Sequence, residues 1–396
     1  MAACGSEVAL IVPPPPPPGE LSLRLVPDPE DAGFAQALGW GAAIPSATVT
    51  VASYDPGQPL RTFQSESDGT VRLNGLTRGD YRVEVRRPLN GSERGRAGGG
   101  VVGWFAGEAR RLESGVTPIA VAALASRRGT LVISEWSFNS AFPAGQNAYH
   151  DHSYLELYNA SDATIFLDGM ILGRGFVMGY DFPTISCNAV ADFANDSIGV
   201  WSDIQQRFPG RGQDHPVLPG QTVLVATDAI DHRPFGGPGT VDLSDADFEL
   251  VAVTDVDNPA VPNLIDVGPR AATLHGIVWN PLWSAVFIAR PTDLTTLVSR
   301  RPPTASVDYR RFPTSQLLDL VSYFTSWTGN PYPACPRLLH PHLDRAPATG
   351  MGQDEHADVS YSLQRIRLET APVVLLQDTR NSAIDFVRAL RTPGVP

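Results

Sequence analysis

Lysine is absent from this chain of 396 residues, and the sequence supplies its positive charge through arginine alone. We attribute this absence to codon usage in a GC-rich genome and not to a function. With 30 basic and 42 acidic residues the formal net charge is −12, which disfavours nucleic acid as a partner because its phosphates would repel such a surface. No run of 18 apolar residues occurs, so the sequence predicts no membrane-spanning helix.

Short motifs typical of enzymes are absent as well. The sequence contains no G-x-S-x-G, H-E-x-x-H or C-x-x-C motif and no glycine-rich phosphate loop. Catalytic residues that meet only in the folded chain would leave no such trace. On this basis we expect a protein that is not an enzyme and that has no cofactor.

The composition that remains is that of a loop-rich β-protein. Hydrophobic residues make up 42% of the chain, enough to form cores, while 36 glycines and 36 prolines are many for a helical enzyme. A length of 396 residues suits two or three domains better than one ordinary sandwich.

The clearest pattern lies between residues 131 and 173, where three pieces read as short strands closed by turns: LVISEW, YLELYNASD and IFLDGMILG. In the second piece Leu155 and Leu157 fall on one face, and Tyr154, Glu156 and Tyr158 fall on the other. That period of two predicts a half-buried strand, followed by a turn of Asn, Ser and Asp.

The order of these pieces resembles the lamin-tail fold, an immunoglobulin-like β-sandwich. The resemblance implies an enlarged domain over residues 128–396, with long loop insertions, that binds or assembles and does not catalyse. Met170 stands where lamin-tail domains often carry a tryptophan.

An earlier stretch, DGTVRLNGLTRGDYRVEV at residues 68–85, alternates around two glycine turns and predicts a hairpin. It is similar to the carboxypeptidase-regulatory, transthyretin-like domains of secreted proteins, in which the tyrosine plugs the sandwich. We therefore expect a first β-sandwich over residues 20–127, and an all-β fold of two sandwich domains overall.

Residues 1–19 have a different character. MAACGS at residues 1–6 resembles the end of a bacterial lipoprotein signal, in which small residues precede a lipidated cysteine, here Cys4. Six prolines at residues 13–18 form a stiff polyproline spacer. The alternative is a disordered cytoplasmic leader.

Taken in order, these motifs and the later pieces DLSDADFE, DVDNPAVPNL and QDTRNSAIDF resemble a family of uncharacterised bacterial surface lipoproteins. The resemblance implies a cell-surface or outer-membrane location outside the cytoplasm, with a membrane contact through the lipid anchor only. We expect a non-enzymatic binding or assembly module for a protein partner, for which an outer-membrane β-barrel is one candidate. The alternative is a glycan- or metal-binding accessory protein that serves uptake.

Cysteines and histidines offer the remaining site candidates. Cys187 and Cys335 form one pair that an oxidising exterior could join in a disulfide, and two buried thiols are the alternative. An extended strand through residues 150–152 would place His150 and His152 on one face, where neutral imidazoles suit a transition metal. A third ligand would have to come from elsewhere, with these donors as candidates: His215, His232 or Asp231.

Three further expectations concern acidic and apolar residues. Asp255 and Asp257 offer oxygens of the kind that calcium takes, although such residues more often cap turns. Glu135 and Glu156 lie on adjacent predicted strands; they could act as general acid and base, but we expect them to accept hydrogen bonds from loop backbone. Residues 373–376 (VVLL) predict a strand buried beside residues 131–133.

Overall fold

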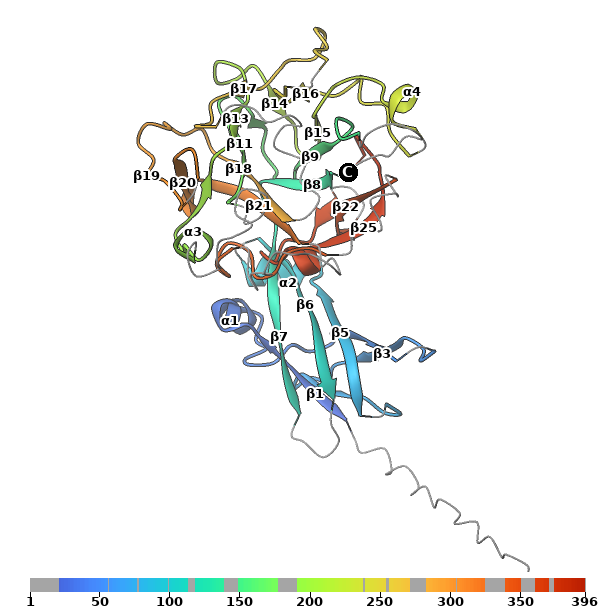
Figure 1. The fold of residues 1–396 in the computed structure, drawn as a ribbon. Coiled ribbons are helices and arrows are strands. Elements are labelled where there is room, and N and C mark those ends of the chain that lie inside the picture. The colour runs from blue at the N-terminus through green and yellow to red at the C-terminus, as the bar shows by residue number, and fades with distance from the viewer. Residues whose placement is uncertain are drawn as a thin grey trace, which may run out of the picture. The chain divides into compact units, whose positions relative to one another are not determined.

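The computed structural model describes the following residues: 21–55, 57–76, 78–98, 100–112, 118–138, 149–176, 191–237, 239–253, 256–270, 283–303, 305–324, 339–349, 360–369 and 374–395. Strands dominate these residues and the helices are short, so the predicted all-β class is confirmed (Figure 1). None of the helices in these ranges is both long and apolar enough to cross a membrane. The chain divides into two compact units, residues 1–87 with 104–125 and residues 88–103 with 126–396.

The first unit is built on one seven-stranded sheet in the order β3-β2-β5-β6-β7-β1-β4. Its β1 and β7 are parallel, whereas β1 and β4 are antiparallel. Short helices follow β1 at Pro29–Asp31 (η1) and Ala32–Ala37 (α1); a third, α2 (Gly91–Ala97), lies between β5 and β6 in residues assigned to the second unit. The strands are β1 Ser22–Pro27, β2 Thr48–Ser53, β3 Arg61–Gln64, β4 Thr70–Arg72, β5 Gly79–Pro88, β6 Val101–Leu112 and β7 Ile119–Arg127.

The hairpin predicted over residues 68–85 is wrong, although its inward pattern is right. Val71, Tyr81 and Val83 are all buried, as the alternation predicts. However, β4 pairs with β1, whereas β5 pairs with β2 and β6. The link between them, which turns at Gly75 with a φ of +78°, therefore carries the chain from one end of the strand order to the middle. A tight-turn pattern does not fix the partner of the strand that follows.

The second unit packs two main sheets against each other. One has six strands in the order β16-β15-β9-β8-β22-β25, and the other has five in the order β17-β13-β11-β18-β21. The six strands are β16 Phe248–Glu249, β15 Thr222–Ala226, β9 Tyr154–Asn159, β8 Leu131–Ser137, β22 Tyr361–Arg365 and β25 Phe386–Leu390. The five are β17 Ile265–Asp266, β13 Gln205–Arg207, β11 Ile171–Arg174, β18 Trp283–Ala289 and β21 Leu317–Phe324.

Smaller elements complete this unit. A three-stranded sheet contains β12 (Gly199–Ser202), β20 (Tyr309–Pro313) and β19 (Ser299–Arg300). Two strand pairs are β10 (Ile165–Phe166) with β14 (Pro216–Val217), and β23 (Arg367–Glu369) with β24 (Leu375–Leu376). The short helices are α3 Ala191–Ala194, α4 Arg233–Gly236, η3 Thr314–Gln316 and α5 Ser382–Asp385.

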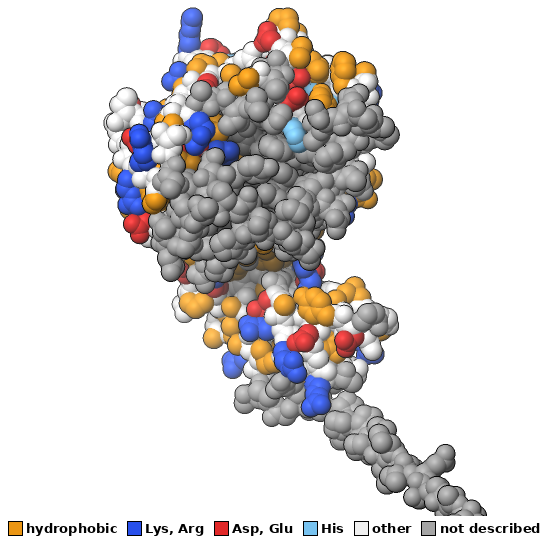
Figure 2. Space-filling view, in the orientation of Figure 1, with side chains coloured by type: hydrophobic (Ala, Val, Ile, Leu, Met, Phe, Trp, Pro, Cys, Tyr) orange, Lys and Arg blue, Asp and Glu red, His pale blue; other side chains and the backbone are white. Residues whose placement is uncertain are grey.

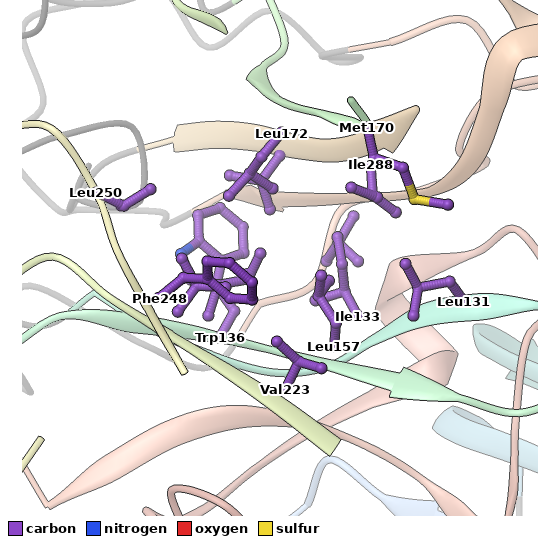
Figure 3. Close-up of a cluster of buried hydrophobic side chains, with 14 of the residues drawn as sticks. Leu131, Ile133, Trp136, Leu157, Met170, Leu172, Val223, Phe248, Leu250 and Ile288 are labelled. Atoms are coloured by element: carbon purple, nitrogen blue, oxygen red, sulfur yellow. The ribbon is translucent and has the colours of Figure 1, made fainter. Parts of the chain in front are cut away.

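The main apolar core lies between the two large sheets (Figure 3). Trp136 and Leu157 enter it from β8 and β9, and Leu172 and Ile288 enter it from β11 and β18. Met170, at the position where a tryptophan was expected, packs into the same cluster and is 6% exposed. The thioether thus fills the space without a larger ring.

Two strand predictions need correction. All six residues of β9 are buried, so the strand is not half-buried as predicted. Of the predicted strand at residues 373–376, the described residues 374–376 do not pair with β8: Leu375 and Leu376 form β24, which pairs with β23, while the neighbours of β8 are β9 and β22. Leu376 nevertheless packs against Val132 and Tyr158 on the outer face of β8 and β9, and so helps to bury it. The periodicity of a strand's own sequence cannot reveal that its outer face is buried, because the side chains that cover this face come from remote segments.

One extra residue in β8 shifts the pairing with β9. Ile133 pairs with Leu157 and Glu135 pairs with Glu156, which leaves Ser134 without a partner. Such a bulge reverses the faces of the residues that follow it. Ile133 before the bulge and Trp136 after it therefore point into the same core, although they are three positions apart.

At the bulge, side chains from other strands also form the hydrogen bonds of the Ile133 backbone. Its N–H donates to Asp319 Oδ2 of β21 at 2.7 Å, and its carbonyl accepts from Arg365 Nε of β22 at 2.8 Å. Arg365 Nη2 in turn donates to Asp319 Oδ2 at 2.5 Å. A buried ion pair thus ties β8, β21 and β22 together across both sheets.

We predict that Arg365→Met lowers the free energy of unfolding by about 3–5 kcal/mol, because Asp319 would remain buried without its cation. The double variant Arg365→Met/Asp319→Leu removes both charges and should recover most of that loss. Urea unfolding of the full chain, followed by near-ultraviolet circular dichroism, measures both. A double variant as unstable as the single one would contradict this account.

Candidate functional site

Glu135 and Glu156 lie directly opposite each other on β8 and β9 as a result of the bulge. They are 2% and 0% exposed, respectively. Two adjacent carboxylates in an apolar environment repel each other and are costly to charge. The groups that surround this pair therefore decide what it can do.

Glu135 receives hydrogen bonds from three directions. The Tyr154 hydroxyl on β9 and the Ser362 hydroxyl on β22, the latter at 2.6 Å, both donate to Oε1. Thr392 donates its backbone N–H at 3.1 Å and its hydroxyl at 2.9 Å. Glu135 is the acceptor in all of these hydrogen bonds, which suits a charged carboxylate.

Glu156 has fewer partners. Its Oε1 lies 2.7 Å from the Ser134 hydroxyl, and its Oε2 accepts the Gly394 N–H at 2.8 Å. Burial, and secondarily the charge of Glu135, raise the pKa of Glu156 to about 7. The expectation that both glutamates accept hydrogen bonds from loop backbone matches these contacts with residues 392 and 394.

Beside the pair, Arg391 reaches His152, with Nη1 2.6 Å from Nδ1. A guanidinium has no acceptor, so His152 Nδ1 must be the unprotonated nitrogen and its Nε2 carries the hydrogen. Burial, assisted by the charge of Arg391, holds the pKa of His152 well below its usual range. Burial likewise lowers the pKa of Arg391 to about 10. His152 is thus a neutral imidazole.

A second neutral histidine lies next to the first, with ring centroids 6.3 Å apart. His232 Nε2 is 2.8 Å from the carbonyl oxygen of Asp228, an acceptor, so this nitrogen carries the hydrogen. Its Nδ1 can then accept from the Tyr149 hydroxyl at 2.5 Å. Burial lowers the pKa of His232 as well.

The histidine arrangement predicted for a metal does not form as expected. Residues 150–152 make a turn and not an extended strand, so His152 is buried while His150 remains partly exposed. The fold does bring His152 and His232 together, but the Nδ1 atoms of both accept hydrogen bonds and both Nε2 atoms carry hydrogens. Asp231 points elsewhere and pairs with Arg233. Within the described ranges, no three His, Cys, Asp or Glu side chains are placed to hold a metal ion.

The other predicted site residues are dispersed or fall outside the described ranges. Asp257 is exposed and accepts a hydrogen bond from the Asn263 side chain at 2.6 Å. Asp255 and the three cysteines, Cys4, Cys187 and Cys335, lie outside the described residues.

A buried glutamate that the motif search did not single out organises a long loop. Glu249 on β16 accepts the Ala229 N–H at 2.6 Å and the Asn258 N–H at 3.2 Å. Asn258 also donates from its side chain to the carbonyl of Ala229 at 2.8 Å. These contacts hold Asn258, which lies between β16 and β17, against Glu249 and Ala229. In the sequence, Glu249 is one acidic residue in an apolar stretch after DLSDADF. This pattern is also typical of a strand at the surface, so it does not distinguish a buried glutamate from an exposed one.

Comparisons with known proteins agree on an uncharacterised family. Residues 218–392 match the family described as "Protein of unknown function (DUF4876)". A crystal structure of a DUF4876 family protein from Bacteroides thetaiotaomicron VPI-5482 is similar to this chain, with a TM-score of 0.53 and 16% identity over 93% of this chain and 95% of that one. At this identity the likeness shows the fold alone. A search of curated proteins finds no match.

We predict that Tyr154→Phe lowers the free energy of unfolding by about 1.5–3 kcal/mol, because it removes a hydrogen bond to a buried carboxylate. Tyr158→Phe, on the same strand, is the matched control: its hydroxyl donates to the neutral carbonyl of Val374 at 3.1 Å. The control should cost about 0.5–1.5 kcal/mol. Equal losses in urea unfolding would show that the carboxylate contact has no special weight.

Proposed function

We propose that the protein is a non-enzymatic, lipid-anchored surface protein whose second unit binds a protein partner through its long loops. The observation that carries this proposal is the exposure of three aliphatic side chains in the described residues between β16 and the end of β17. Val253 and Val256 are 66% and 61% exposed, and Ile265 of β17 is 41% exposed. Exposed aliphatic side chains of this kind are what a protein interface uses.

The buried acidic and basic groups support the same proposal. The carboxylates of Glu135 and Glu249 accept hydrogen bonds from their own chain, and the histidines are engaged with neighbouring side chains and backbone. A general acid or base must instead be able to reach a substrate. Polar groups used in this way stabilise loops, which is the property a binding surface needs.

The chemistry around the loop indicates the kind of partner. Asp257 is exposed beside Val256, and Asp266 follows Ile265. On the face drawn in Figure 2, hydrophobic and acidic side chains lie next to one another at the end of the unit where Figure 1 labels β16 and β17. A complementary partner presents aliphatic side chains together with arginine or lysine.

The double variant Val253→Asp/Val256→Asp should lose its partner, because two carboxylates would enter an apolar contact. Cross-linking of the full-length protein in native membranes, followed by purification and mass spectrometry, would identify the neighbours. Val298→Asp is the matched control, since Val298 is 50% exposed and lies outside residues 251–266. Recovery of the same neighbours with the wild type, the control and the double variant would contradict the proposal.

The anchor is tested separately. We expect protein purified from native membranes to begin at Cys4 and to carry acyl chains on that residue, as measured by intact mass spectrometry. Cys4→Ser should abolish the modification and release the protein from the membrane fraction, because no second anchor is proposed. Native protein that begins at an unmodified Met1 would contradict the lipid anchor without affecting the loop proposal.

A further inference from the structure

One end of the first unit carries exposed apolar side chains and arginines beside the point where the chain enters the fold. The Leu73 N–H donates to the carbonyl of Leu21 at 2.8 Å, so residues 1–20 are attached at this end. The same end holds the start of β1 and the end of β4, because Ser22 pairs with Arg72. Five exposed or half-exposed side chains gather here and are called the tether end: Tyr54, Leu60, Arg61, Arg78 and Arg111.

Backbone and side-chain contacts join the link between β2 and β3 to this end. Arg61 is the first residue of β3, and its Nη1 donates to the carbonyl of Asn74 at 3.5 Å. Asn74 follows Leu73, the residue that bonds to Leu21. Leu60, which precedes Arg61, therefore lies close to the point where the chain enters β1.

The start of β5 and the end of β6 complete the tether end. The Tyr54 N–H donates to the carbonyl of Asp80 at 3.1 Å, which holds the end of the β2 segment against the start of β5. Arg111, near the end of β6, has its Nη1 3.9 Å from Asp80 Oδ2. Arg78 lies two residues before Asp80 and is exposed. The five side chains thus share one end of one compact unit.

The apolar members of the tether end are among the most exposed large hydrophobic residues of the described chain. Tyr54 and Leu60 both lie in the link between β2 and β3 and are 60% and 65% exposed. Tyrosine combines an apolar ring with a polar hydroxyl, and such side chains concentrate at the interface between lipid and water. An exposed leucine beside it adds an aliphatic group that the acyl region of a bilayer can take up.

The tether end is basic although the whole chain has a formal net charge of −12. Its three arginines face two exposed acids, Asp55 and Asp80, and Asp80 lies beside Arg111. Within the described part of the chain, Arg61 and Arg78 form no ion pair, so both guanidiniums can bind phosphate oxygens. The neighbouring charges cancel in two pairs: Arg72 with Glu66 at 3.1 Å and Arg82 with Glu84 at 2.8 Å.

We propose that the tether end contacts the surface of an anionic bilayer when the chain is anchored through Cys4. This inference rests on the lipid anchor of the proposed function and adds a second, weaker membrane contact to it. Tyr54 and Leu60 enter the headgroup region, while Arg61 and Arg78 bind lipid phosphates. The partner-binding residues of the second unit take no part in this contact.

The anchor makes a weak contact sufficient. Leu21 lies 17 residues after Cys4, so the chain between them spans at most about 60 Å even when fully extended. A surface held within that distance of the membrane meets it at an effective concentration on the order of millimolar. Two apolar side chains and two free arginines cannot hold an untethered chain, but they can orient a tethered one.

Photo-cross-linking to lipid tests this contact in the full-length chain. A Cys4→Ser variant with an N-terminal hexahistidine tag is tethered to vesicles of phosphatidylcholine, phosphatidylglycerol and a nickel-chelating lipid. The photoreactive residue p-benzoylphenylalanine replaces Leu60 in one sample and, as the matched control, Val298, which is 50% exposed, in another. Mass spectrometry should find lipid adducts at position 60 about tenfold or more above those at position 298.

The charge requirement is tested in the same vesicles. Each arginine near an anionic surface strengthens binding by about fivefold, so Arg61→Glu/Arg78→Glu should lower the adduct yield at position 60 about tenfold or more. Vesicles without phosphatidylglycerol should lower the yield for the unaltered arginines in the same direction, which tests the charge requirement even if the double variant does not fold.

Three results would overturn the proposal. The first is an equal adduct yield at positions 60 and 298. The second is a yield at position 60 that depends neither on the two arginines nor on phosphatidylglycerol. The third is cross-linking from position 60 to a second copy of the chain in place of lipid. Because the tag replaces the acyl chains, none of these results depends on lipidation. An unmodified Cys4 in native protein would contradict the anchor alone.

Discussion

The Arg365 guanidinium is surrounded by protein and reaches three strands that the chain forms far apart in sequence. It pairs with Asp319 of β21 and donates a hydrogen bond to the backbone carbonyl of Ile133 of β8, as a neighbouring strand would do. Its Cζ atom lies 4.6 Å from the centroid of the Phe386 ring. A buried charge tolerates few alternative positions, because each donor must keep an acceptor. The two sheets of the second unit are therefore fixed relative to each other at this point, and the apolar core fills the space that results.

Buried carboxylates order the long insertions of this unit in the same way. Asp168 accepts backbone N–H groups of Gly212, Asp214 and His215, and these hydrogen bonds lower its pKa to about 2. Asp344 accepts from the backbone and hydroxyls of Ser322 and Ser382. Each acid replaces several hydrogen bonds that a loop would otherwise make to water. Loops fixed in this way can expose aliphatic side chains without collapsing onto the core.

Sequence patterns predicted the parts of this fold that depend on neighbouring residues. Strand and turn patterns located β8 and β9, and the all-β class followed from composition and turns. The patterns failed where remote segments decide. The hairpin predicted at residues 68–85 was wrong, since the partner of β4 is β1.

The candidate site was predictable only in part. The adjacent strands placed Glu135 near Glu156. Nothing local indicated that Thr392 would bond Glu135 and Gly394 would bond Glu156, at sequence separations of 257 and 238. The pairing of His152 with His232 likewise depends on a turn that an extended reading of residues 150–152 does not contain. Polar contacts between distant segments leave no periodicity, so their partners become visible only in the fold.

The unpaired Ser134 has a consequence for how this chain can change through evolution. Losing that one codon would turn every later residue of β8 over, so that Glu135 would enter the apolar core and Trp136 would leave it. No single further substitution could restore both faces. The insertion is therefore easy to keep and difficult to reverse, whatever the protein binds, and descendants should retain a residue there even after the serine itself has been replaced.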